Sequence, residues 1–122
     1  MLKKTYTIDI YNHYKINVVL ATDIKEATDK YLKDFNIDLE NVEGFFTYHP
    51  NKPMEGWIVV APDCSTSIIA HEAFHATYKV MSDIGGELSY SSEESYAYLL
   101  GYITNMVVKT ILAYNKLPKS SK

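Results

Sequence analysis

The sequence predicts one small α+β domain over residues 1–122, in which a mixed β-sheet packs on helices. Segments rich in β-branched and aromatic residues occupy its first half, and long helical patterns occupy its second half. A chain of 122 residues has room for one domain with its own core. Hydrophobic residues make up 47% and charged residues 22%, which is the balance of a folded globular protein. We expect the order β-β-α-β-β-α-α.

Four segments of the first half have the alternating, β-rich composition of strands: residues 5–10, 15–21, 44–49 and 56–61. The polar stretch around Asn12 and His13 predicts a hairpin turn between the first two strands. Asp23 and Glu26 form a capping box, which opens a helix running to about Phe35. The fourth strand is followed directly by a proline, which is expected to end it.

The second half predicts two long helices, over residues 66–82 and 91–114. Each has two candidate N-caps: Asp63 or Ser65 for the first helix, and Ser91 or Ser92 for the second. The first helix is expected to stop at Gly85 and Gly86, because glycine readily takes the conformation that ends a helix.

The last helical segment is apolar nearly all round between Tyr96 and Leu112. About 20 apolar residues suffice to span a membrane. However, Gly101, Asn105 and Lys109 interrupt the segment. We therefore expect a core helix, one face of which can form a homodimer contact, and no association with a membrane.

The charge balance argues against a nucleic-acid-binding role. The formal net charge is −3, and all 12 basic residues are lysines, whereas nucleic-acid binders usually show a basic stripe with arginines. The single cysteine, Cys64, excludes an internal disulfide and fits a reducing compartment. The N-terminal residues have no apolar run of the kind found in signal peptides, so a cytoplasmic location is expected.

The segment His71-Glu72-Ala73-Phe74-His75 is an HExxH motif within the first long helix. Residues four positions apart lie on the same face of a helix, so both imidazoles can reach one metal ion. The carboxylate of Glu72 would then lie beside the water held by that metal. The sequence therefore predicts a zinc site with His71 and His75 as ligands and Glu72 as the catalytic base. The alternative is a hydrogen-bonded pair of surface histidines.

A catalytic zinc usually has three protein ligands, so a further ligand is expected. The downstream carboxylates that could supply it are Asp83, Glu87, Glu93 and Glu94. Glu94 is the predicted third ligand, because small Ala97 and Gly101 on the same face would let that helix approach another closely. Glu93 would then point outward. Cys64 lies about 10 Å along the helix from His71, too far to share the metal, and is expected to be a small buried residue.

The two motifs together, HEAFH and, after 18 residues, Glu94-Ser95-Tyr96-Ala97, resemble the gluzincin pattern of HExxH followed by ExxA. The chain resembles the minimal gluzincins, compact zinc-protease-like domains of phage and mobile elements, and ImmA/IrrE-type metallopeptidases over residues 56–112. The resemblance implies a zincin-like fold, in which the strand at 56–61 is an edge that aligns a peptide substrate. Larger gluzincins often have an Asp where this chain has Tyr98.

The predicted function is a zinc-dependent metallopeptidase that hydrolyses peptide bonds with a metal-activated water. Four residues are candidates for stabilising the oxyanion: His49, Tyr90, Tyr96 and Tyr98. The alternative is a catalytically inactive module of the same fold, with a structural zinc and a partner-binding surface. A third interpretation is a structural protein in which HExxH is accidental.

Overall fold

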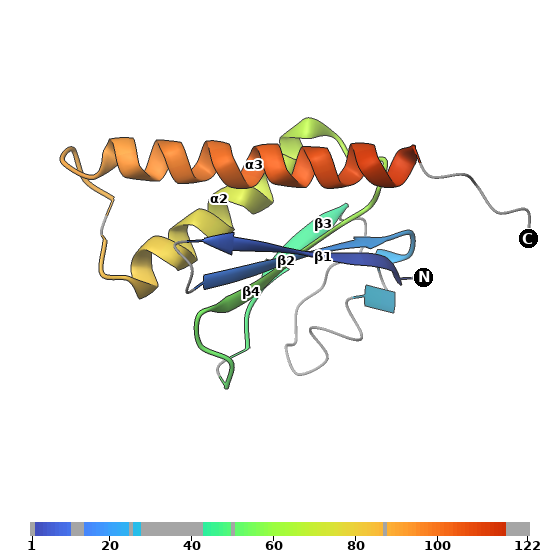
Figure 1. Cartoon of the computed structure of the whole chain (residues 1–122), viewed down its shortest axis with the longest axis horizontal. Helices are drawn as coiled ribbons and strands as arrows, with labels where there is room; N and C mark the ends of the chain where they lie inside the picture. The colour runs from blue at the N-terminus through green and yellow to red at the C-terminus, as the bar shows by residue number, and fades with distance from the viewer. Residues whose placement is uncertain are drawn as a thin grey trace, which may run out of the picture.

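The computed structural model describes residues 2–10, 14–24, 26–27, 43–49, 51–86 and 88–116. It confirms a small α+β fold, with the described strands and helices in the order β1 (Leu2–Ile10), β2 (Tyr14–Ala21), β3 (Gly44–Thr47), β4 (Glu55–Val60), α2 (Thr66–Asp83) and α3 (Glu93–Asn115). Figure 1 shows α3 running along the length of the molecule, with α2 crossing at an angle to it; α2 contacts β3 and β4, and α3 contacts β1 and β2.

The four strands form one mixed sheet in the order β1-β2-β4-β3. β1 and β2 pair antiparallel, β2 and β4 pair parallel, and β3 and β4 pair antiparallel. β4 therefore lies inside the sheet and is not the edge strand that the resemblance implied for residues 56–61. Among the described strands, β3 occupies the edge that contacts α2.

The main core lies between the sheet and the two helices. Alternate residues of the central strands, such as Ile16, Val18 and Ile58, point toward this layer and are fully buried. Their neighbours in sequence, such as Val19 and Val59, point to the opposite face and form a second, smaller cluster. β2 is buried along almost its whole length because both faces of this central strand are covered.

The ends of α2 follow the predicted signals. Ser65 is the N-cap, and its hydroxyl accepts a hydrogen bond from the backbone N–H of Ile68. At the other end, the N–H of Gly86 donates to the carbonyl of Met81 at 2.7 Å, and the N–H of Gly85 donates to that of Ser82. Gly85 has a φ of 90°, which a residue with a Cβ rarely adopts. This pattern is a Schellman motif, in which two terminal carbonyls of the helix are satisfied.

α3 buries a single stripe against the rest of the domain. Tyr96, Leu99, Ile103, Val107 and Ile111 recur at helical spacing and are buried, as expected of a core helix. Within the described part of the chain, no helix has the length and apolar character needed to cross a membrane.

Part of the first half cannot be compared with the prediction. The predicted turn at Asn12 and His13 lies outside the described residues, as does most of the helix expected up to Phe35. Positions 24, 26 and 27 are helical, and the side chain of Asp23 accepts a hydrogen bond from the N–H of Glu26 at 3.1 Å. This bond is one half of the predicted capping box.

A buried tyrosine ties the sheet to the end of α2. Tyr14, at the start of β2, is 1% exposed, and its hydroxyl donates to Oδ2 of Asp83 at 2.7 Å. Lys79, one turn earlier on α2, forms an ion pair with the same carboxylate oxygen. Burial, together with the hydrogen bond to Asp83, raises the pKa of Tyr14 above its ordinary value.

Replacing Tyr14 with phenylalanine should lower the free energy of unfolding by about 1–2 kcal/mol, because the variant loses a hydrogen bond to a carboxylate. The raised pKa has a second effect. Above pH 10 the unfolded chain releases this phenolic proton while the folded chain keeps it, so the stability of the wild type falls as pH rises. Tyr14→Phe should lose less stability in that range. Urea unfolding of wild type and variant from pH 7 to 11 measures the free energy of unfolding and its change with pH. Tyr98→Phe, at an exposed position, is the control.

Candidate functional site

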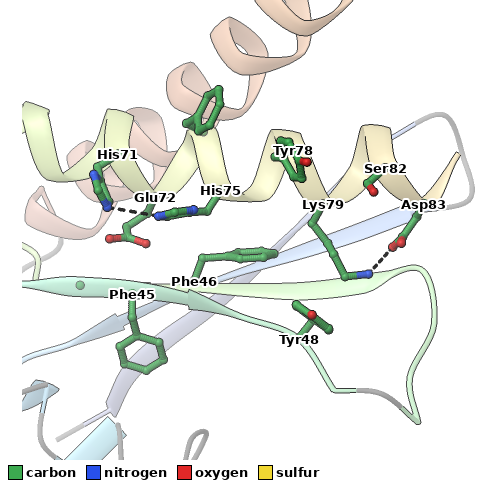
Figure 2. A pocket seen from close by; sticks show the side chains of 12 residues that line it. Phe45, Phe46, Tyr48, His71, Glu72, His75, Tyr78, Lys79, Ser82 and Asp83 are labelled. Carbon is green, nitrogen blue, oxygen red and sulfur yellow. Dashed lines mark hydrogen bonds and ion pairs between the residues drawn. The ribbon is translucent and has the colours of Figure 1, made fainter. Parts of the chain in front are cut away.

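The two histidines of the HExxH motif lie one turn apart on α2 and their rings converge. Their Nε2 atoms are 3.2 Å apart, and their ring centroids are 4.8 Å apart. Both side chains are exposed, and both line a cavity beside the helix. Figure 2 shows the pair on the wall of this cavity, facing β3. The i, i+4 spacing of the motif therefore produces the same-face arrangement that the sequence predicts.

The separation of the two nitrogens fits a shared metal ion. Two imidazole ligands at about 2.0–2.1 Å from a tetrahedral zinc have nitrogens about 3.3 Å apart. Burial lowers the pKa of His75, and the charge of nearby His71 lowers it further. Both effects favour the neutral form of His75, which is the form that binds metals. This donor set fits two of the positions around a divalent transition metal.

Glu72 lies behind the histidine pair and is the buried acid of the site. It is 6% exposed, and no hydrogen bond from a described residue reaches its carboxylate. Burial raises the pKa of Glu72, although the charge of His71 lowers it in part. A carboxyl group with a raised pKa beside two potential metal ligands is suited to accept a proton from a bound water.

The cavity beside these residues has a volume of about 930 Å³ and lies between α2 and β3. This volume is within the range of about 300–1,000 Å³ that is usual for ligand sites. Five of its twelve lining residues are Phe or Tyr, among them Phe46 and Tyr48 on the β3 side and Phe74 and Tyr78 on α2. In Figure 2 the ring of Phe46 lies between β3 and His75.

The cavity depends on a glycine in the neighbouring strand. A Cβ on Gly56 of β4 would come within 2.8 Å of the Phe46 ring, so only glycine leaves room for that ring. Sequence reasoning missed the roles of Phe46, Tyr48 and Tyr78. The available signal was that the polar face of the HExxH helix also carries aromatic residues at helical spacing, Phe74 and Tyr78.

The predicted third ligand does not join the histidines. Glu94 is exposed in the first turn of α3 and does not line the cavity. The reason is the orientation of α3: Tyr96 and Leu99 face the core, which leaves Glu94, Ala97 and Gly101 exposed. Figure 1 also shows α3 beginning near the end of α2, whereas His71 lies in the first half of α2.

The other acids and Cys64 do not complete a metal site among the described residues, which contain no group of three or more His, Cys, Asp or Glu side chains able to hold a metal ion. Asp83 pairs with Lys79, Glu93 is exposed on α3, and Glu87 lies outside the described residues. Cys64 packs against the core but is only half-buried, less than the buried position expected, and burial raises the pKa of its thiol to about 11.

None of the four candidate oxyanion stabilisers lines the cavity. Tyr96 is buried, and its hydroxyl donates to the carbonyl of Gly86 at 2.7 Å. His49 is exposed, and its Nδ1 accepts a hydrogen bond from the N–H of Asn51. Tyr90 and Tyr98 are exposed elsewhere on the surface. Besides the two histidines, the cavity is lined instead by four side chains with polar hydrogens: Tyr48, Tyr78, Lys79 and Ser82.

A family model described as "Protein of unknown function (DUF1493)" matches residues 2–68. No curated protein and no solved structure matches the chain significantly. The matching model is not that of a gluzincin, and no three-ligand group is present among the described residues. The resemblance to minimal gluzincins and ImmA/IrrE-type enzymes is therefore wrong. The matched region contains all four strands and ends three residues before His71.

Replacing Glu72 with glutamine should raise the free energy of unfolding by about 1 kcal/mol at pH 7.5, because the variant buries no charge. The pKa of Glu72 is raised in the folded state, so the wild type gains stability as pH falls through that pKa and the carboxyl group becomes neutral. The difference in free energy of unfolding between Glu72→Gln and the wild type should therefore shrink toward pH 4. Urea unfolding at several pH values measures it. Exposed Glu93→Gln is the control, and equal stability of Glu72→Gln and wild type at pH 7.5 would contradict the prediction.

Proposed function

The chain belongs to the DUF1493 family of proteins of unknown function, and we propose that its α2 cavity is the active site of a zinc-dependent hydrolase that cleaves peptide bonds. The observation that carries the proposal is the 3.2 Å separation of the His71 and His75 Nε2 atoms, which suits a shared tetrahedral ion. The adjacent buried carboxyl group of Glu72 and the 930 Å³ cavity in front of it support a catalytic use of that ion.

In this proposal His71 and His75 hold the ion through Nε2. Zinc bound there would lower the pKa of a coordinated water toward about 7 and polarise a substrate carbonyl. The carboxylate of Glu72 would be the base that takes a proton from such a water and returns it to the leaving amine. The pKa of Glu72 is raised by burial, which brings its proton affinity closer to that of the groups between which it moves the proton.

The form of the cavity favours a peptide as the substrate. It is open, so a chain can lie between α2 and β3, and its aromatic walls suit apolar side chains. Apart from the tyrosines, polar side chains make up half of the lining residues and gather at its two ends: His71, Glu72 and His75 at one, and Lys79, Ser82 and Asp83 at the other. Such a site binds a ligand by apolar contact and orients it with polar groups at fixed points.

A second candidate function is a non-catalytic metal-binding module. It is favoured by the finding that the described residues bring together two imidazoles without a third protein ligand. A partner protein or a second copy of the chain would then complete the coordination. The exposed face of α3, which carries Tyr98, Tyr102 and Leu112, would be the contact surface in a homodimer.

Zinc should bind to metal-free protein at one ion per chain, and His71→Ala or His75→Ala should weaken binding by at least about tenfold, because each removes one ligand. Isothermal titration calorimetry measures the affinity and the stoichiometry. His49→Ala is the matched control, because this exposed histidine lies outside the cavity. Unchanged zinc affinity in both variants of the motif would sink the proposed metal site.

Hydrolysis of a mixed peptide library, followed by mass spectrometry, should require zinc and Glu72. Glu72→Gln should slow hydrolysis by at least about a hundredfold, since general bases contribute on the order of 10²–10⁴ to rates. Zinc affinity should stay the same, because Glu72 is not a ligand in this scheme. Glu93→Gln, which alters an exposed acid on α3, is the control. Zinc binding without any hydrolysis would favour the second candidate.

A further inference from the structure

Lys79 closes the end of the cavity opposite the histidine pair. Its side chain extends from α2 toward Tyr48, just beyond β3, with Nζ 4.3 Å from the centroid of the tyrosine ring. It also forms an ion pair with Oδ2 of Asp83 on its own helix. Lys79 is thus a cation held at a fixed point on the cavity wall, between an aromatic face and a carboxylate.

The cation retains capacity for another ligand. An ammonium group has three N–H donors, of which Asp83 takes one and the Tyr48 ring faces another. The carboxylate oxygen that Lys79 contacts is shared with the hydroxyl of Tyr14, so Asp83 is held in place from the sheet as well. Ser82 lines the same end of the cavity and adds a hydroxyl donor. These donors suit an anion with two oxygen atoms.

The distance between the two ends of the cavity sets the size of the ligand. His75 and Lys79 are four residues apart on α2, which is about 6 Å along the helix. An extended peptide advances about 3.3 Å per residue, so about two residues fit between the histidine pair and Lys79. Two aromatic residues line the cavity along this stretch, Phe46 from β3 and Tyr78 from α2, and both offer apolar surface to a side chain.

We propose that this cavity binds the C-terminal end of a peptide, with the terminal carboxylate on Lys79 and an apolar last side chain against Phe46 and Tyr78. The inference rests on the proposed function for the peptide nature of the ligand, and it makes the reaction one that removes residues from a chain end. The ammonium of Lys79 complements the carboxylate in charge, and the Tyr48 ring lies against the same ammonium group.

The test compares three short peptides on protein freed of metal with EDTA: acetyl-Ala-Ala-Phe as the free acid, the same peptide as its C-terminal amide, and acetyl-Ala-Phe-Asp amide. Removing the metal prevents a carboxylate from binding to zinc, so the measurement reports on the Lys79 end alone. It reads binding by calorimetry and needs no hydrolysis. Failure of the zinc or peptidase proposals therefore leaves this comparison interpretable.

The free acid should bind at least about tenfold more tightly than either amide, as a charge-assisted contact would give. Lys79→Gln should remove this preference, and Lys79→Arg should keep it because the positive charge remains. Lys52→Gln is the matched control, since Lys52 lies over Trp57 and does not line the cavity.

Three results would overturn the inference. The first is equal affinity for the free acid and its amide, or no binding of either. The second is a preference that survives Lys79→Gln. The third is equal affinity for acetyl-Ala-Phe-Asp amide and the free acid. That result would mean that Lys79 binds any carboxylate and does not recognise the end of a chain.

Discussion

The packing of α2 across β3 and β4 determines where each polar group of the cavity lies. Small buried residues, Ala73 and Ala76, let the helix approach the sheet closely, and this contact fixes the rotation of the helix about its axis. His71 and His75 are turned toward the open side by this rotation, while Glu72 is turned inward. The chemistry of the site therefore depends on an apolar contact that involves none of its reactive groups.

Glu72 is the local exception in an otherwise consistent fold. Burial of a carboxylate disfavours its charged form, and among the described residues only the charge of His71 favours it. Proteins usually depart from the rule that buried charged groups are paired at functional sites, where reactivity matters more than stability. The histidine pair and the cavity both lie beside Glu72. The loss of stability caused by burying this carboxylate therefore occurs at the candidate functional site.

Local sequence patterns predicted most of the fold, and non-local packing accounts for what they missed. The alternation of apolar and polar residues predicted the strands, and Ser65 and Gly85 predicted the two ends of α2. These signals act within a few residues. The sheet order could not be predicted in the same way, since the parallel pairing of β2 and β4 joins distant segments. The spacing of the HExxH motif fixed the histidine pair, but the orientation of Glu94 depended on which stripe of α3 is buried. The aromatic walls came from two segments whose proximity no local pattern encodes.

The parallel pairing of β2 and β4 also bears on how the site is assembled. In that pairing Val18 lies opposite Ile58, 40 positions further along the chain. The histidine pair needs only one helical turn, which forms on a timescale of about a microsecond or less. The opposite wall lies on β3, which pairs directly with β4 and is joined to the rest of the sheet through the parallel pairing of β4 with β2. The two sides of the cavity thus arise at different ranges of sequence: a single helical turn brings the imidazoles together, whereas the wall that faces them is placed by pairing between strands.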